Sequence, residues 1–257
     1  MRFKLPTVAM ILALTLVHAE KAFGQAATAA QAKPAARISA FIDVNFGAVF
    51  PAQDAFTSKG SYALPYFDEA WSRSYDYTVR TMKGIDVSGG VLFTSNLGVG
   101  VALSSVGSGA PPTVTSTGPS FEAPYAFQTT TFVPEWESKR HETSVHLSFV
   151  FEPTARSSKF QVRLYGGPTY FSVSQDLLDS SLSREPTTAS TSAWGYHVGG
   201  DIGYFFAKHI GLGGGVRYAG ATVTIPDTAM DRYSSEGHTQ DVRVGGLSLA
   251  FGLRVRF

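Results

Sequence analysis

The chain ends in an alternating stretch, Leu247-Ser-Leu-Ala-Phe-Gly-Leu-Arg-Val-Arg-Phe257, in which every odd-numbered residue is apolar. Because successive side chains of a β-strand point to opposite faces, this period predicts a strand with one apolar face and one face of small or cationic residues. A soluble sheet protein would bury the apolar face, whereas a strand in a membrane would expose it to lipid. Features elsewhere in the sequence favour the membrane.

The N-terminus has the order of charge, apolar run and small residues that is typical of a secretory signal peptide. Two cationic residues precede the apolar run Leu5–Val17, and small residues follow it. The run is too short for a membrane-spanning helix. We therefore predict a signal peptide over residues 1–26, cleaved after Ala26 or, as the second choice, after Gly24. An Ala-rich leader over residues 27–37 follows it.

The composition excludes several classes of site. The chain has no cysteine, so cysteine acylation, disulfides and thiolate metal sites are excluded. The formal net charge of +1 and the lack of a basic cluster give no support to nucleic acid as a partner. Histidines are scattered without metal-ligand spacing, so we expect no metal and no cofactor. Aromatic residues at 13%, with 26 glycines and 16% charged residues, are typical of a sheet protein with tight turns and a large apolar exterior.

Alternation of the kind seen at the C-terminus recurs along the chain after residue 37. It predicts eight strands, over residues 38–50, 79–93, 97–106, 143–152, 160–173, 193–206, 210–224 and 241–257. In the last of these the pair Gly245-Gly246 shifts the parity, which predicts a β-bulge.

The connections between these strands alternate in length. Residues 94–96, 153–159 and 207–209 are short connections, whereas residues 50–78, 107–142, 174–192 and 225–240 are long and rich in Ser, Thr, Gly, Pro and Tyr. Short turns at one end and long loops at the other are typical of an up-and-down transmembrane barrel. We therefore predict an all-β, eight-stranded antiparallel transmembrane β-barrel over residues 38–257, with the leader and both termini on the periplasmic side.

Charge is absent from the apolar parity of all eight predicted strands within their central band. Lys83 has this parity but lies near the outer end of its strand. An Arg or Lys that faces lipid at mid-bilayer costs about 2–4 kcal/mol, so this absence is expected for a lipid-facing surface. Backbone groups in hydrocarbon must also be paired, so the first and last strands must join.

The signal segment, the eight alternating strands and the terminal Phe257 resemble the small outer-membrane β-barrel proteins around the barrel domain of OmpA. The stretch Asp201–Tyr218, D-I-G-Y-F-F-A-K-H-I-G-L-G-G-G-V-R-Y, resembles the penultimate hairpin of that group. This resemblance implies integral location in the outer membrane, contact with lipid and lipopolysaccharide, and a role for Phe257 as the signal read by the outer-membrane assembly machinery. No peptidoglycan-binding domain follows the barrel here, so a link to the cell wall is not implied.

The inward parity carries charged residues that need partners. Eight strands leave an interior about wide enough for side chains to fill, and buried charges require ion pairs. If Phe206 pairs with Leu212 across the short turn, Asp201 lies opposite Arg217. We expect three lumen ion pairs, structural or gating, namely Asp201–Arg217, Asp43–Arg254 and Glu152–Arg163.

We therefore expect a monomeric barrel with a filled polar lumen, a structural or surface-interaction role, and long extracellular loops that are suited to a surface ligand. Two alternatives remain open, a narrow OmpW-like pore for ions or small hydrophobic solutes and a soluble secreted ligand-binding barrel. His146 and Ser148 resemble the His-x-Ser pair of outer-membrane lipid A deacylases, but their parity points inward, away from any acyl chain. We therefore expect no catalytic residues and no enzymatic activity.

Overall fold

The computed structural model describes residues 38–64, 69–119, 127–155, 158–178, 186–226 and 239–257. These residues belong to one compact unit, Ala36–Phe257. The predicted signal peptide and leader, residues 1–37, lie outside the described residues. Every element of secondary structure in the described ranges is a β-strand. In the same ranges there is no helix long and apolar enough to span a membrane.

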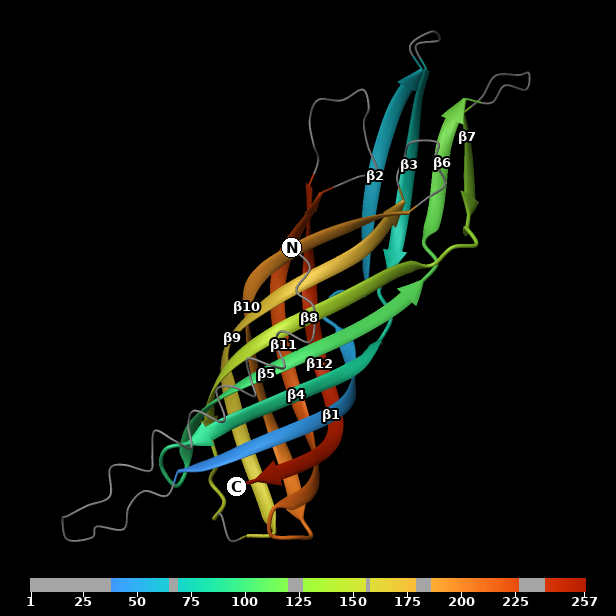
Figure 1. The fold of residues 1–257 in the computed structure, drawn as a ribbon. Helices are drawn as coiled ribbons and strands as arrows, with labels where there is room; N and C mark the ends of the chain where they lie inside the picture. Colours follow the sequence, from blue (N-terminus) through green and yellow to red (C-terminus); the bar gives the residue numbers. More distant parts are fainter. Residues whose placement is uncertain (1–37, 65–68, 120–126, 156–157, 179–185, 227–238) are drawn as a thin grey trace, which may run out of the picture. The chain divides into compact units, whose positions relative to one another are not determined.

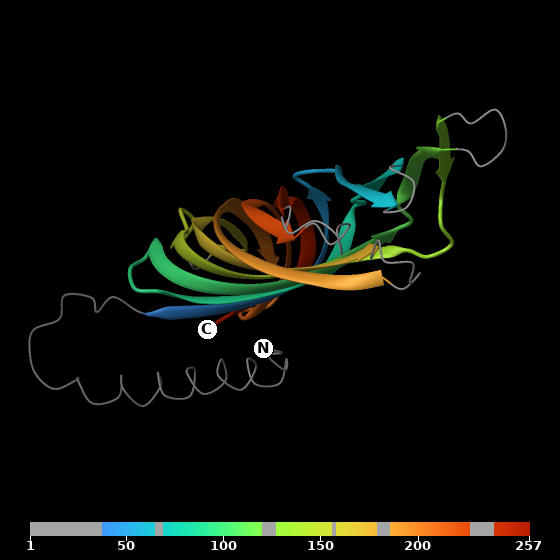
Figure 2. The same ribbon diagram turned by 90° about the horizontal axis from the view of Figure 1, so that it is seen from above.

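Eight strands form a closed antiparallel barrel, and Figure 2 shows them curving round into a ring. Strand β1 (Ser39–Pro51) pairs with β12 (Thr239–Arg256) from Phe41↔Arg256 to Pro51↔Gly246, which joins the first strand to the last. This confirms the predicted eight-stranded fold and its closure. Around the ring from β12 follow β11 (Ile210–Pro226), β10 (Pro186–Phe205), β9 (Phe160–Leu178), β8 (Ser138–Phe151), β5 (Leu97–Ala110) and β4 (Met82–Leu92).

A second sheet is built from segments that we predicted as loops. Strands β2 (Ala55–Leu64), β3 (Glu69–Thr78), β6 (Thr113–Pro119) and β7 (Phe127–Phe132) lie in the order β2-β3-β6-β7 (Figure 1). Two hairpins supply them, one between β1 and β4 and the other between β5 and β8. The loop prediction was wrong here because these segments contain many Thr residues together with Tyr and Phe, which favour strands.

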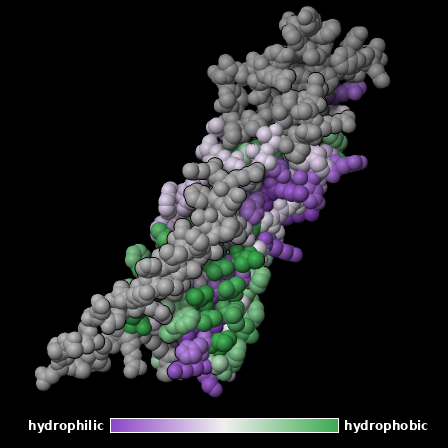
Figure 3. Space-filling view, viewed as in Figure 1, coloured by the Kyte–Doolittle hydropathy of each residue, from purple (hydrophilic) through white to green (hydrophobic). Residues whose placement is uncertain are grey.

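The outer wall of the barrel carries a belt of exposed apolar side chains, with the parity predicted from the sequence. Phe149 is 74% exposed and Phe251 is 61% exposed. On the face shown in Figure 3, hydrophobic residues gather over the barrel and hydrophilic residues lie toward the second sheet. Other large members of this apolar belt are Phe46, Ile85, Val99, Leu147, Leu164, Val198, Ile202, Leu212, Val216 and Leu249.

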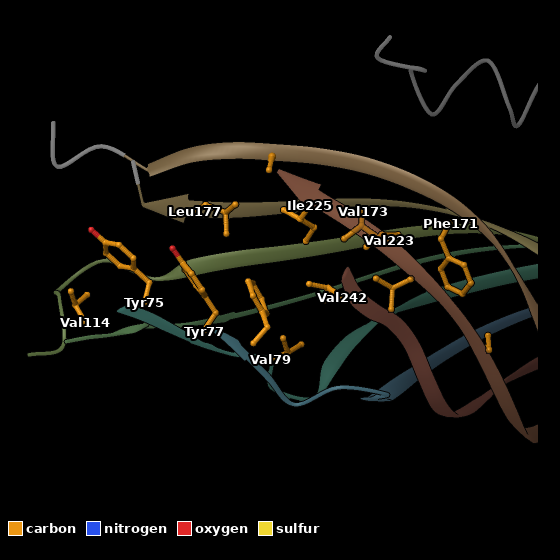
Figure 4. Packing of buried hydrophobic residues seen from close by; sticks show 14 residues of the cluster. Tyr75, Tyr77, Val79, Val114, Phe171, Val173, Leu177, Val223, Ile225 and Val242 are labelled. Atoms are coloured by element: carbon orange, nitrogen blue, oxygen red, sulfur yellow. The ribbon is translucent and has the colours of Figure 1, made fainter. Parts of the chain in front are cut away.

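The loop end of the barrel interior is filled by a core of buried apolar side chains, which we call the apolar plug. Phe56, Tyr75, Tyr77 and Val114 from the second sheet share this core with side chains of β9, β10, β11 and β12 (Figure 4). The rings of Phe56 and Tyr77 stack with their centroids 4.9 Å apart. The barrel residues of this apolar plug are Phe171, Val173, Leu177, Ala189, Ala219, Val223, Ile225, Val242 and Val244.

The predicted bulge in the last strand is absent. The β11–β12 register runs without a break through Gly220↔Gly245 and Ala219↔Gly246. Gly245 and Gly246 instead have positive φ angles of 82° and 144°. A Cβ on Gly246 would lie 1.9 Å from the carbonyl oxygen of Phe50. Glycine is therefore needed at both positions for the positive φ angles, and at Gly246 also because the backbone of β1 passes too close to leave room for a side chain.

The seam between β1 and β12 gives a direct test of barrel closure. A Cβ on Gly252 would lie 1.9 Å from the carbonyl oxygen of Val44 in the neighbouring strand. We expect Gly252→Ala to lower the free energy of unfolding by about 1–3 kcal/mol through overpacking. Urea unfolding of the protein in lipid vesicles, followed by tryptophan fluorescence, measures the change. Gly220→Ala is the matched control because its nearest neighbour would be Tyr218 Oη at 3.4 Å; equal losses for the two variants would contradict the prediction.

Candidate functional site

The lumen near the short turns holds a cluster of buried charges around Arg163 of β9. Its Nη1 donates to Asp43 Oδ2 of β1 at 2.5 Å, and its Nε lies 3.7 Å from Glu152 Oε2. All three side chains are at most 3% exposed. The guanidinium also lies over the ring of Phe41, 3.6 Å from its centroid. Gln161 Nε2 donates to Glu152 Oε2 at 2.6 Å, so this carboxylate has two partners.

Arg254 of β12 completes the same cluster. Its Nε donates to Asp201 Oδ1 at 3.1 Å and lies 3.7 Å from Asp43 Oδ1. Its Nη1 donates to Asn45 Oδ1. The lower charge cluster, defined as Asp43, Glu152, Arg163, Asp201 and Arg254, therefore joins three carboxylates to two guanidinium groups.

Another ion pair, outside this cluster, crosses the lumen between β11 and β4. Arg217 Nη2 of β11 donates to Asp86 Oδ2 of β4 at 2.8 Å and to Ser104 Oγ at 2.7 Å. Ser104 Oγ in turn donates to Asp86 Oδ2 at 2.5 Å. Strands β4 and β11 are not neighbours in the barrel. This contact therefore ties together two separated parts of the wall.

The structure brings two of the three predicted pairs together and corrects the third. Asp43 lies opposite Arg254 in the β1–β12 register, and Glu152 approaches Arg163 as described above. Asp201 and Arg217 do not form the predicted ion pair, because Asp201 pairs with Arg254 and Arg217 pairs with Asp86. The reason is register, since Phe205 pairs with Gly211 and Asp201 therefore lies opposite Gly215. A shift of two residues preserves parity, so both side chains still point inward.

Two histidines lie in the middle of the lumen. His146 and His197 lie with ring centroids 4.9 Å apart, and Thr169 Oγ1 is 2.9 Å from Nδ1 of each. His146 Nε2 is 2.9 Å from Ser144 Oγ, and His197 Nε2 is 2.9 Å from Ser148 Oγ. Each ring nitrogen therefore has a hydroxyl partner. His146 and Ser148, the pair that resembles a deacylase motif, are bonded to other residues and face the lumen.

A further ion pair lies on the loop side of the histidines, on β8. Arg140 Nη2 lies 2.7 Å from Glu142 Oε1, and both side chains are 3% exposed. Glu142 Oε2 also accepts the backbone N–H of Gly245 at 3.0 Å. This pair was not predicted, because both residues lie in the range 107–142 that was expected to be a loop. Their inward parity relative to His146 was the signal that could have found them.

Two small cavities lie inside the lumen. Cavities of about 40 Å³ and about 20 Å³ lie among the lumen residues Asn45, Asp86, Tyr165, Asp201 and Arg217. One water needs roughly 10–15 Å³ on this measure, so each holds at most a few waters. A larger cavity of about 730 Å³ opens at the short-turn mouth, between Phe41 and Phe257. The described residues include no group of three His, Cys, Asp or Glu side chains that could hold a metal ion.

The terminal residue lies beside the first strand. The backbone N–H of Phe257 donates to Ala40 O at 2.9 Å, and its side chain is 65% exposed. The aromatic ring is therefore accessible at the outer rim of the short-turn end. Its predicted role as an assembly signal is compatible with this exposure.

Comparison with known proteins identifies the fold. No model of a known protein family and no curated protein sequence matches the chain. The crystal structure of the outer membrane protein OprG from Pseudomonas aeruginosa matches with a TM-score of 0.52 and 13% identity, over 86% of this chain and 97% of that chain. At this identity the match shows the fold alone: an eight-stranded barrel of the kind found in outer-membrane proteins.

Two further solved structures have lower scores. Ail, the attachment invasion locus protein of Yersinia pestis, matches with a TM-score of 0.41 and 12% identity, over 85% of this chain and 99% of that chain. Neisserial surface protein A matches with a TM-score of 0.40 and 14% identity, over 86% and 97% of the two chains.

Double-mutant cycles distinguish the observed ion pair of Arg217 from the predicted one. We expect a coupling energy of about 1–3 kcal/mol between Asp86→Asn and Arg217→Met, because these side chains are in contact. The cycle of Asp201→Asn with Arg217→Met should give a clearly smaller coupling. Urea unfolding, with Trp194 on the barrel wall as one of the fluorescent reporters, supplies the four free energies for each cycle. A larger coupling for Asp201 would contradict the register described here.

Proposed function

We propose that this protein is an integral outer-membrane barrel with a closed lumen and a structural or surface-interaction role. The observation that carries the proposal is the filling of the interior. Charged and hydrogen-bonded side chains occupy the lumen, cavities of about 40 and 20 Å³ remain among them, and the apolar plug covers the loop end. A continuous water path does not fit such an interior.

The location in the membrane is supported by the apolar belt. Exposed Phe, Leu, Ile and Val side chains encircle a closed barrel, where a soluble barrel would carry polar groups. Aromatic residues flank the belt, with Phe151, Phe206 and Phe257 at the short-turn end and Trp194 and Tyr218 toward the loop end. Residues 38 and 257 both lie at the short-turn end, which supports a periplasmic position for both termini.

The proposed partners follow from this placement. The belt contacts membrane lipid and, in the outer leaflet, lipopolysaccharide. The accessible Phe257 is presented to the outer-membrane assembly machinery. Strands β2, β3, β6 and β7 form the surface that is available to an extracellular ligand. The burial of His146 and His197, 1% and 3% exposed, and the inward position of Ser148 keep these groups away from an outside substrate, which supports a protein without catalytic activity.

A charge in the apolar belt tests the location. We expect Phe251→Arg to lower the free energy of unfolding in lipid vesicles by about 2–4 kcal/mol, because the new charge would face hydrocarbon. Ser190→Arg is the matched control, since Ser190 is exposed on β10 beyond the belt and should cost less than about 0.5 kcal/mol. Equal costs, or recovery of the wild-type protein from the periplasm without detergent, would end the membrane proposal.

Electrical recording tests the closed lumen. We expect the purified wild-type protein to give no steady single-channel steps in planar bilayers, because the ion pairs and the apolar plug fill the path. Arg217→Ala and Asp201→Ala serve as comparison variants. Steady wild-type steps that either substitution abolishes or enlarges would favour the alternative, a narrow pore for ions or small solutes.

A further inference from the structure

Strand β7 is a free edge on the surface side of the protein. In the described residues it pairs with β6 alone, from Val114↔Phe132 to Pro119↔Phe127, and it ends the order β2-β3-β6-β7. The chain passes from β7 to β8 before it reaches the apolar belt, and the outward residues at the start of β8, Lys139 and His141, are polar and exposed. Strand β7 is therefore surrounded by water and not by lipid.

This edge lacks the devices that normally protect a free strand. Natural edge strands carry charges, proline or bulges that prevent pairing with another chain. The sequence of β7, Phe-Gln-Thr-Thr-Thr-Phe, contains none of these, and its residues favour strand structure. All side chains from Gln128 to Phe132 are exposed, with Phe132 at 48% and the following Val133 at 60%. Such an edge is suited to accept a further strand.

We propose that β7 pairs with β7 of a second copy of this chain, in antiparallel orientation about a two-fold axis at Thr130. This inference names a partner for the surface-interaction role proposed above and rests on that proposal. A two-fold axis perpendicular to a sheet places its central residue opposite itself. Thr130 then faces Thr130 of the second copy, Thr129 faces Thr131, and Phe127 faces Val133.

The sequence favours a second copy over an unrelated peptide. Three consecutive threonines are symmetric about Thr130, and no charge on the strand would face a like charge across the axis. Strand-addition sites for foreign peptides combine the edge with pockets for alternate side chains. The cavities described above are lined by barrel and turn residues, and none is lined by β7. Recognition here would therefore depend on backbone pairing and threonine contacts.

Strand β6 holds the edge in place for this pairing. Thr115 Oγ1 lies 3.3 Å from Thr131 Oγ1, and Thr117 Oγ1 lies 3.0 Å from Thr129 Oγ1. Val114 of the same strand is buried in the apolar plug. An interface of about seven residues per chain is small, so the association is weak and depends on concentration. Closure of the barrel does not require a second copy, because β1 pairs with β12 of the same chain.

Single cysteines test the register, and the cysteine-free chain makes each disulfide unambiguous. Under mild oxidation in detergent, Thr130→Cys should form a disulfide-linked dimer, because Cα atoms of facing residues lie within the range that a disulfide spans. Thr129→Cys alone should not, since the two copies of residue 129 are offset along the strands. A mixture of Thr129→Cys and Thr131→Cys chains should cross-link.

The matched control is Thr115→Cys on β6, which has strands on both sides and should stay monomeric. Light scattering of the wild-type protein should show a mass that rises with concentration. The pairing would be overturned if Thr130→Cys stayed monomeric while its heat-modifiable gel mobility showed that it was folded. Equal cross-linking of Thr115→Cys would also overturn it. Because these measurements report on β7 alone, their failure is distinct from failure of the closed-barrel proposal, which conductance and the belt variants test.

Discussion

The requirement that every backbone group in the barrel wall has a partner governs this structure. The β1–β12 pairing meets it by joining the first strand to the last from Phe41↔Arg256 to Pro51↔Gly246. Once the sheet is closed, parity decides which side chains face outward and which face the lumen. One face of each strand forms the apolar exterior and the other forms the lumen, so the interior has to accommodate charge, histidine and hydroxyl groups within a narrow space.

The lumen meets this demand in layers. The lower charge cluster lies near the short turns, the Asp86–Arg217 pair and the two histidines lie above it, and Arg140–Glu142 borders the apolar plug. Buried charges add little net stability but are costly to leave unpaired. A register that separated these partners would leave buried charges unpaired, at a cost in stability. This network explains why the interior leaves so little free volume.

The sequence predicted what depends on parity and missed what depends on position along the strand. The alternation in Leu247–Phe257 gave the correct outward face, and the same rule placed Asp43 opposite Arg254. A two-residue error in the β10–β11 turn exchanged the partner of Asp201, because period-two patterns do not distinguish registers that differ by two. The Asp86–Arg217 contact links strands that are not neighbours, so pairing rules cannot predict it. Strands β2, β3, β6 and β7 were missed because their segments, rich in Ser and Thr, also suit loops.

The lumen ion pairs have a consequence for the order of assembly. Arg163 on β9 reaches Asp43 on β1, and Arg217 on β11 reaches Asp86 on β4. Neither contact can form within one hairpin, so an unclosed sheet must keep these four groups hydrated. In the membrane barrel that we propose, closure of the wall and neutralisation of the interior are thus coupled to the same final event, the pairing of β1 with β12. A nascent chain halted before that event would hold water where the finished protein holds salt bridges.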